Sequence, residues 1–155
     1  MPVALVTGGS AGLGRALVRA LADRGWVVVV DGRDAQRLDQ AADRPGILPV
    51  PGDVTDADHR ARLVAAVRLQ GRLDLLVHNA GTLGPLGPVR LPALADVTVE
   101  DLQHVWRHNI GAPLVLTTQL LGDLVASRGV LLGISSDAAV EHYPGWGLYG
   151  ASKAG

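Results

Sequence analysis

The sequence has no cysteine and no excess of charge of either sign. The absence of cysteine excludes disulfide bonds and thiolate metal sites. The formal net charge is −1, which leaves no basic surplus for binding nucleic acid. Nearly half of the 155 residues are hydrophobic, enough for one domain with its own core. An enzyme or a binder of small molecules is therefore the favoured class.

Long hydrophobic runs are also missing. Apolar stretches such as residues 27–30 are far shorter than the roughly 20 residues of a membrane-spanning helix. The first residues lead directly into a glycine-rich turn, without the basic flank and apolar stretch of a signal peptide. We therefore expect a cytoplasmic protein that has neither a membrane nor a nucleic acid as partner.

Lysine is nearly absent. Of the 14 basic residues, 13 are arginine and only Lys153 is lysine. The guanidinium of arginine is a planar fork that stays charged, whereas an ammonium is compact and its charge depends on its surroundings. A lysine kept at this one position indicates a task that arginine does not perform.

Short apolar runs alternate with longer helical patterns, which is typical of βαβ units that build a parallel sheet. We predict strands at residues 3–7, 26–31, 47–50, 73–78 and 130–134, helices at residues 13–24, 35–42, 57–69 and 99–125, and a loop at residues 82–95. The strands are nearly all apolar, as expected of strands covered on both faces. Residues 1–155 are therefore predicted to form one α/β domain.

Two predicted helices carry a start signal. Thr55 with Asp58, and Thr98 with Asp101, each combine a hydroxyl cap with an acid three residues later. We expect both helices to begin at these threonines.

A glycine-rich segment, Thr7-Gly8-Gly9-Ser10-Ala11-Gly12-Leu13-Gly14, follows the first predicted strand. Glycines at such a turn allow positive φ and let a pyrophosphate approach the free N–H groups of the next helix. The spacing is not G-x-G-x-x-G. It resembles the T-G-x-x-x-G-x-G pattern of the short-chain dehydrogenase/reductase family, which assigns Thr7, Gly8, Ser10, Gly12, Leu13 and Gly14 to cofactor binding. For the motif alone, a tight turn without a ligand is the alternative.

Further segments match the motifs of this family in order along the chain. They are Asp53-Val54 after the third predicted strand, Asn79-Ala80-Gly81 after the fourth, and then Asn109, Ser136, Tyr149 and Lys153. The resemblance implies that Asp53 and Val54 contact the adenine of the cofactor. It implies that Asn79, Ala80 and Gly81 support the central sheet beside the cofactor. It also implies a Rossmann-type, doubly wound parallel sheet of about five strands in the order 3-2-1-4-5.

Tyr149 and Lys153 are four residues apart, so on a helix their side chains lie on the same face. A positive charge near a phenol favours the phenolate, which is a better base. The resemblance makes Tyr149 the general acid/base at the substrate oxygen, while Lys153 promotes its ionisation and holds the nicotinamide ribose. It makes Ser136, thirteen residues before Tyr149, a hydrogen-bonding partner of the reacting carbonyl or hydroxyl.

Asn109 precedes Pro113 by four residues within one predicted helix. Proline has no N–H, so the carbonyl of Asn109 is left free and the helix is expected to kink there. In the family, the backbone of this asparagine holds a water that links the lysine to solvent. The alternative is a proline that only bends the helix around the core.

The choice of cofactor depends on the end of the second predicted strand. Asp31 ends that strand, where a carboxylate accepts the ribose hydroxyls of NAD and repels a 2′-phosphate. Counted from Gly14 against the family, however, the acid that selects NAD falls on Gly32, one residue later. Arg33 then takes the place of the basic residue that grips the phosphate of NADP. We therefore favour NADP(H) over NAD(H).

Other polar side chains have simpler interpretations. His104 and His108 are one helical turn apart, but no third metal ligand is evident, so we predict no metal site and a solvated helix face. His142, Tyr143 and Trp146 lie where the family lines its substrate pocket, and ordinary loop packing explains them equally well. Asp137 either polarises the site beside Ser136 or caps a turn.

Members of the family continue past the position of Gly155 through two more strands and a loop that closes over the substrate. We therefore expect residues 1–155 to be a Rossmann domain truncated at its C-terminus, with the fifth strand as an exposed edge. Such a chain is expected to aggregate and to be inactive alone. Full-length members commonly pair through the helices that bear Asn109 and Tyr149, which implies a homo-oligomer.

The function that the resemblance implies is an NAD(P)-dependent oxidoreductase acting on a small carbonyl or alcohol substrate. A non-catalytic nucleotide-binding or sensor protein is one alternative, although such relatives usually lose Tyr or Lys, and Tyr149 and Lys153 are both present. A sugar-nucleotide epimerase is another, but its T-G-x-x-G-x-x-G spacing differs from that of this chain.

Overall fold

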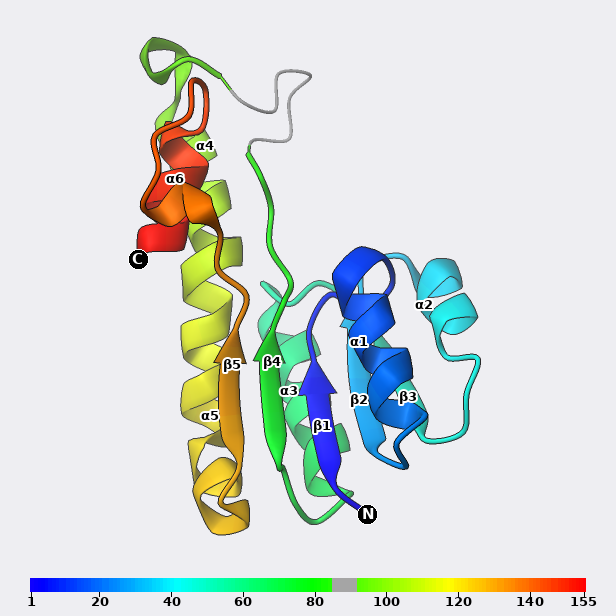
Figure 1. Ribbon diagram of the computed structural model, residues 1–155. Helices are drawn as coiled ribbons and strands as arrows, with labels where there is room; N and C mark the ends of the chain where they lie inside the picture. The colour runs from blue at the N-terminus through cyan, green and yellow to red at the C-terminus, as the bar shows by residue number, and fades with distance from the viewer. Residues whose placement is uncertain (85–91) are drawn as a thin grey trace.

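The computed structural model describes residues 1–84 and 92–155. A sheet of five parallel strands has the order β3-β2-β1-β4-β5. The strands are β1 (Val3–Val6), β2 (Val27–Gly32), β3 (Ile47–Pro51), β4 (Leu75–His78) and β5 (Val130–Gly133). The helices are α1 (Gly12–Ala22), α2 (Ala35–Ala41), α3 (Ala57–Arg68), α4 (Val99–Trp106), α5 (Ala112–Ser127) and α6 (Gly147–Ala154). The strands run side by side with their carboxyl ends at one edge (Figure 1).

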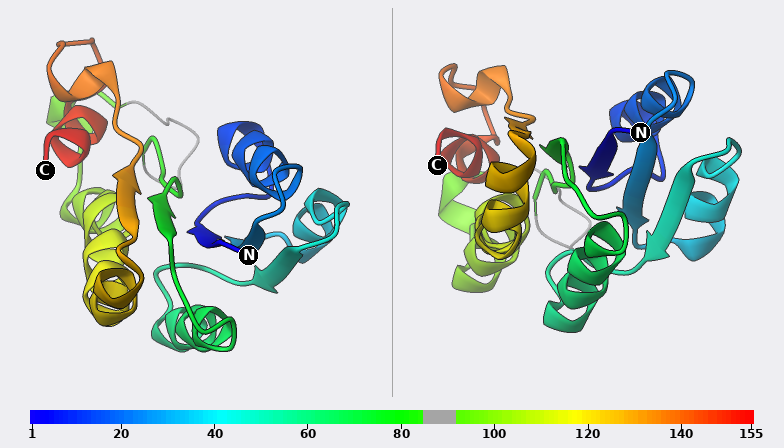
Figure 2. Two further views of the ribbon diagram at one scale, coloured as in Figure 1. Left: turned by 60° about the horizontal axis from the view of Figure 1, so that its bottom comes forward. Right: turned by 90° about the horizontal axis from the view of Figure 1, so that it is seen from below.

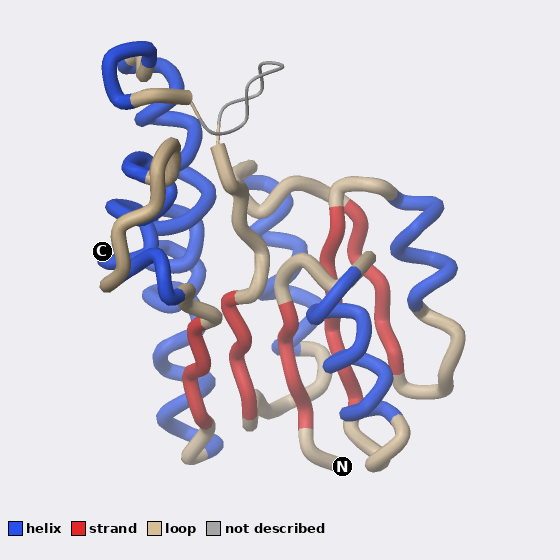
Figure 3. The backbone as a smooth tube through the Cα atoms, turned by 45° about the horizontal axis from the view of Figure 1, so that its top comes forward, coloured by secondary structure: helices blue, strands red, loops and turns tan. Residues whose placement is uncertain are grey.

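Alternating side chains of the strands build a core on each face of the sheet. Leu5, Val29 and Leu76 face α3 and α5, together with buried leucines and valines of those helices. Val6 and Val28 belong to the opposite core, with residues of α1 and α2. Figure 2 shows α1 and α3 on opposite sides of the sheet, and Figure 3 shows the strands between the helices. The predicted Rossmann-type, doubly wound parallel sheet is confirmed, strand order included.

The predicted strands and the first three predicted helices are all present, with ends that differ by at most two residues. The capping prediction is confirmed at Thr98, where the side chain and Asp101 exchange two hydrogen bonds. It is wrong at Thr55. The cap of α3 is Asp56, which accepts the N–H groups of residues 58 and 59, because the hydroxyl of Thr55 donates to Asp53 instead. Of the predicted loop 82–95, residues 85–91 lie outside the described part of the chain.

The predicted helix 99–125 is interrupted where Pro113 was expected to disturb it. Residues Arg107–Gly111 form a π-helical segment between α4 and α5, in which the N–H of Ala112 reaches back five residues to the carbonyl of Arg107. π-segments are one of the recognised causes of irregularity in long helices. The helix is therefore irregular around Asn109, whereas the expected kink and the free carbonyl of Asn109 stay predictions.

The combined helix Val99–Ser127 has the length and composition of a membrane-spanning helix, with 29 residues and a mean hydropathy of 1.3 over an 18-residue window. The short unbroken apolar runs in the sequence did not indicate a helix of this length and composition. Length and composition are weak evidence, since the core helix of a soluble protein passes the same test. Leu116, Leu120 and Leu124 of this helix are buried against the sheet.

Within the described residues, β5 pairs only with β4 and forms an edge of the sheet. Its Val130, Leu131 and Leu132 remain 59%, 49% and 43% exposed. Helices therefore cover the faces of β5 less completely than those of β1, β2 and β4, and the predicted exposed edge is confirmed.

Candidate active site

The strand order reverses between β1 and β4, which is where open α/β sheets bind their ligands. Two cavities of about 180 and 160 Å³ lie at the carboxyl ends of these strands. The larger contains Asp31, Arg33 and Asp53, and the smaller contains Tyr149 and Lys153. Both are lined by Asn79 and Gly81, so they share one wall. The two cavities are therefore neighbours, and together they form a candidate site for an elongated ligand.

The glycine-rich turn has geometry that requires glycine. Gly8 has a φ of +70°, and a Cβ there would meet the backbone of Ala80 at 2.9 Å. A Cβ on Gly14 would meet the carbonyl of Gly8 and the side-chain amide of Asn79. The sequence therefore lets the start of α1 and the end of β4 approach closely, which opens the first turn of the helix to a ligand.

Thr7 and Asn79 tie this turn to the end of β4. The buried hydroxyl of Thr7 accepts the N–H groups of Asn79 and Ala80, each at 3.1 Å, and donates to the carbonyl of Val77 at 3.2 Å. The amide of Asn79 in turn donates to the carbonyls of Thr7 and Gly8, at 2.9 and 3.0 Å. Asn79 and Ala80 thus join the end of β4 to the glycine-rich turn, and the supporting role of residues 79–81 beside a cofactor stays a prediction.

Not all of the predicted glycine-rich residues line the cavity. Gly8 and Ser10 do, whereas Gly12, Leu13 and Gly14 are absent from its lining. Leu13 is 61% exposed at the start of α1. Their assignment to cofactor binding remains a prediction.

The end of β2 contributes three neighbouring residues to the larger cavity. The carboxylate of Asp31 is 2% exposed and accepts the N–H of Gly8 at 2.6 Å through one oxygen. Its second oxygen contacts the ring of His59 at 3.2 Å. Gly32 has no room for a longer side chain without displacing Ser10, and Arg33 is exposed. Both oxygens of Asp31 thus already have partners inside the protein, which weighs against its role as acceptor of ribose hydroxyls.

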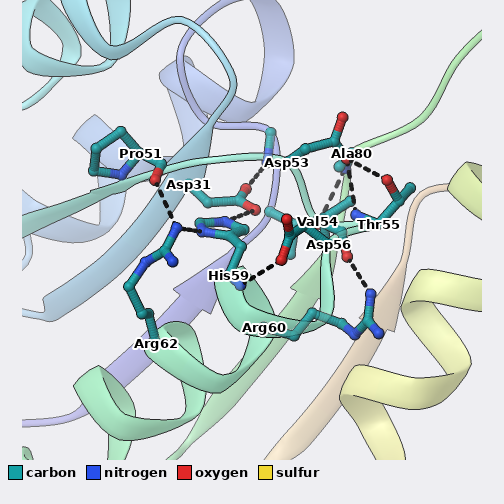
Figure 4. Close-up of polar contacts among 12 residues, drawn as sticks. Asp31, Pro51, Asp53, Val54, Thr55, Asp56, His59, Arg60, Arg62 and Ala80 are labelled. Carbon is teal, nitrogen blue, oxygen red and sulfur yellow. Dashed lines mark hydrogen bonds and ion pairs between the residues drawn. The ribbon is translucent and has the colours of Figure 1, made fainter.

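Asp53 and Val54 line the same cavity, and their contact with the adenine of a cofactor stays a prediction. Burial opposes ionisation of Asp53, but hydrogen bonds from Thr55 and the nearby charges of His108 and Arg33 together hold its pKa below the usual value. One oxygen of Asp53 accepts both the N–H and the hydroxyl of Thr55 (Figure 4). The cavity therefore carries a fixed acceptor beside the buried side chain of Val54.

His108 is a candidate binding residue that the sequence interpretation missed. Its Nδ1 donates to the carbonyl of His104 at 2.9 Å, which leaves Nε2 as the ring nitrogen that faces the cavity. Among the residues that the structure describes, the buried Nε2 has no hydrogen-bond partner, and it lies 3.7 Å from the carboxylate of Asp53. The expected solvated helix face is wrong for His108, whose side chain is 12% exposed. No group of three metal-ligating side chains exists among the described residues.

Tyr149 and Lys153 line the smaller cavity from α6, together with Ser135 and Ile134. The Lys153 ammonium donates to the carbonyl of Ile134 at 2.8 Å and lies 5.7 Å from the centre of the Tyr149 ring. Burial lowers the pKa of Lys153. Trp146 packs edge-on against Tyr149, with ring centres 5.4 Å apart. The predicted pair is therefore on one face of a helix and beside a cavity.

Asn109 anchors this helix by its side chain. Its amide donates to the hydroxyl of Ser152 at 2.8 Å and to the carbonyl of Thr82 at 2.9 Å, and its oxygen accepts the N–H of Thr82 at 2.8 Å. The hydroxyl of Ser152, which is only 3% exposed, donates in turn to the carbonyl of Tyr149 at 2.7 Å, so Ser152 connects Asn109 to the backbone of α6. Sequence reasoning had assigned Asn109 a backbone role and had passed over Ser152 inside the Tyr-to-Lys segment.

Ser136 is not part of the lining of the smaller cavity, whereas its neighbour Ser135 is. The hydroxyl of Ser136 donates to Asp137 at 3.1 Å and accepts the N–H of Ala138 at 3.2 Å. Asp137 also accepts the hydroxyl of Tyr143 at 3.0 Å, and these hydrogen bonds hold its pKa below the usual value. The structure thus brings together Tyr149 and Lys153 but turns Ser136 toward a local turn.

Residues expected to shape the substrate pocket line a different cavity. His142, Tyr143 and Trp146 line a space of about 330 Å³ together with Gly150 and Ala151 of α6. Tyr149 does not line this space.

Comparison with known proteins identifies the family. The pattern described as short chain dehydrogenase matches residues 2–155, and the chain belongs to this family of NAD(P)-dependent oxidoreductases. It is 35% identical over 153 residues to "Serine 3-dehydrogenase" of Agrobacterium fabrum (strain C58 / ATCC 33970), covering 97% of this chain and 59% of that protein. The chain therefore spans less than two thirds of the length of this relative.

Solved structures show the same fold. The "KRED1-Pglu enzyme" superimposes with a TM-score of 0.91 at 33% identity, covering 99% of this chain and 64% of that one. An alcohol dehydrogenase from the archaeon Thermococcus sibiricus, complexed with 5-hydroxy-NADP, superimposes with a TM-score of 0.89 at 25% identity, covering 99% and 66%.

Proposed function

We propose that the protein transfers hydride between NADP(H) and a small carbonyl or alcohol substrate, with Tyr149 as general acid/base. The observation that carries this proposal is the shared wall of the two cavities at Asn79 and Gly81. A dinucleotide laid across this wall would place its two ends in separate cavities, one beside Asp53 and the other beside Tyr149. The activity is proposed for the complete protein, because this chain spans 59% of its relative's length.

The cavities suit a dinucleotide for reasons within this chain. Nε2 of His108 is a buried ring nitrogen without a hydrogen-bond partner among the described residues, and the turn at Gly8 leaves no side chain between a ligand and the backbone. Residues Gly8, Asp53 and Val54 would hold the adenosine half, while Lys153 would hold the nicotinamide ribose. The nicotinamide, when bound, supplies or accepts the hydride.

The chain's own contribution is position and proton transfer. The phenol of Tyr149 would donate its proton to the carbonyl oxygen during reduction and accept it during oxidation. The ammonium of Lys153, 5.7 Å from the ring centre, stabilises the phenolate that remains after donation. Ser135 and Ser136 are both candidates to hold the substrate oxygen. Ser135 lines the cavity, and Ser136 would first have to release its bond to Asp137.

NADP(H) is preferred over NAD(H) in this proposal. Gly32 has no carboxylate to accept the ribose hydroxyls, and Asp31 uses both of its oxygens within the protein. Arg33 borders the cavity with an exposed guanidinium, the group best suited to bind a phosphate with two hydrogen bonds.

Replacing Arg33 tests the cofactor assignment. Arg33→Ala should weaken NADP⁺ binding by about tenfold or more and leave NAD⁺ binding nearly unchanged, because one charge-assisted contact contributes roughly 1.5–3 kcal/mol. Arg24→Ala removes the same charge at the turn after α1 and serves as a control. Calorimetric titration with both cofactors measures the effect. Equal NADP⁺ affinity in Arg33→Ala and the unmodified protein would contradict the preference.

A non-catalytic sensor is not favoured, because Tyr149 and Lys153 are both present and lie beside one cavity. We place the protein in the cytoplasm, as a homo-oligomer that acts on small molecules. Size measurement of the complete protein in solution checks the oligomeric state.

A further inference from the structure

A buried polar chain runs beneath the glycine-rich turn (Figure 4). Arg62 of α3 contacts Nδ1 of His59 at 3.3 Å, and Nε2 of His59 contacts one oxygen of Asp31 at 3.2 Å. The other oxygen of Asp31 accepts the N–H of Gly8 at 2.6 Å. His59 is 1% exposed and Asp31 is 2% exposed. A surface arginine is thereby connected, through two fully buried side chains, to the first glycine of the turn.

The contacts define which nitrogen of His59 carries the proton. A guanidinium can only donate, so Nδ1 of His59 accepts from Arg62. In the neutral ring, Nε2 must then carry the hydrogen and donate it to Asp31. Arg62 thus selects the tautomer that binds the carboxylate, which is how outer partners usually orient a histidine.

The ring of His59 has little freedom to leave this position. The ring packs against Gly52, where any Cβ would meet the ring atoms, and the backbone N–H of His59 is held by the Asp56 cap of α3 at 3.0 Å. Asp31 is less confined on its other side, because it lines the larger cavity next to Gly32 and Arg33. If His59 did not hold it, the carboxylate would gain hydration by turning toward this cavity.

We propose that His59 is a positioning residue for cofactor selection, which holds the carboxylate of Asp31 beneath the turn and out of the phosphate-binding end of the cavity. The inference rests on the proposed use of NADP(H) and deepens it. A carboxylate released into the cavity would lie near the Arg33 side chain. There it would repel a 2′-phosphate and compete with it for the guanidinium, whereas the ribose of NAD⁺ would gain an acceptor.

The test is the ratio of the dissociation constants for NADP⁺ and NAD⁺, measured by calorimetric titration of the complete protein. His59→Leu should reduce the preference for NADP⁺ by about tenfold or more, since placing like charges side by side costs at least the roughly 1.4 kcal/mol that this factor represents. His59→Gln keeps an N–H donor of similar reach and should retain most of the preference. A role in stability alone would weaken the binding of both cofactors equally.

Two further variants keep the test decisive. Asp31→Asn combined with His59→Leu removes the released charge, so the preference for NADP⁺ should return. Arg62→Met changes an exposed residue and keeps both buried side chains, His59 and Asp31. Because Nδ1 of His59 loses its donor, the ratio of the two dissociation constants should shift in the same direction as in His59→Leu, by a smaller factor. This variant also provides a folded protein if His59→Leu does not fold, and an unchanged ratio in it would then overturn the inference.

The remaining outcomes separate the two proposals. An unchanged ratio in a folded His59→Leu variant, or a shift that persists after Asp31→Asn is added, would overturn the role of His59 alone. If the unmodified protein bound neither dinucleotide, the proposed function would fall and the inference with it.

Discussion

Replacing Thr7 by valine tests the link between the glycine-rich turn and β4. Valine has the same shape but cannot accept the N–H groups of Asn79 and Ala80, which lie at 3.1 Å from the hydroxyl. The carbonyl of Val77 loses less, because it still accepts the N–H of Thr7 at 3.0 Å. Two partly buried donors left unpaired cost about 1–1.5 kcal/mol each, so the free energy of unfolding should fall by about 2–3 kcal/mol.

Urea denaturation of the complete protein measures this loss. Thr118→Val makes the same chemical change on the exposed side of α5, where the hydroxyl only donates to a carbonyl of its own helix, and should change stability by less than about 0.5 kcal/mol. Thr7→Ser keeps the acceptor and should be much milder than Thr7→Val. Dinucleotide binding should weaken in Thr7→Val, since Asn79 lines both cavities. Equal effects of Thr7→Val and Thr118→Val would refute the reasoning.

Two more predictions concern stability. Burial lowers the pKa of His78 to about 4, so the unfolded chain binds the proton more readily and stability is lost as the pH falls from about 6.5 toward 4, by about 2 kcal/mol at pH 5. His78→Gln should lack this component in denaturation curves at several pH values, and an unchanged pH profile would contradict it. Thr98→Ala breaks the capping box of α4 and should cost about 1 kcal/mol in the same assay, whereas no loss would show that the cap is dispensable.

The fold was predictable because local patterns and tertiary packing agree. Strands β1, β2 and β4 are buried on both faces, so their sequences are almost purely apolar and easy to locate. The start of α3 was misplaced because two residues compete for the cap. Asp56 takes this role once Thr55 is bound to Asp53, and that contact depends on the loop geometry after β3.

The site was predictable only where short spacing determines geometry. Tyr149 and Lys153 share a helix face because they are one turn apart, and the residues of the glycine-rich turn are adjacent in sequence. The contacts of Asp31 with His59, and of Asn109 with Ser152, join residues 28 and 43 positions apart. No local pattern encodes such pairs. They arise only when the fold brings the end of β2 against α3, and the π-helical segment against α6.

The most direct test of the central claim is the effect of Tyr149→Phe on hydride transfer by the complete protein, followed by NADPH absorbance with a panel of small carbonyl compounds. The variant should lose at least about 100-fold in turnover, the usual contribution of a general acid, and should still bind NADPH. Tyr143→Phe removes a hydroxyl whose partner in the described part of the chain is Asp137, and it should retain turnover. If Tyr149→Phe turned over as fast as the unmodified protein, Tyr149 would not be the proton donor.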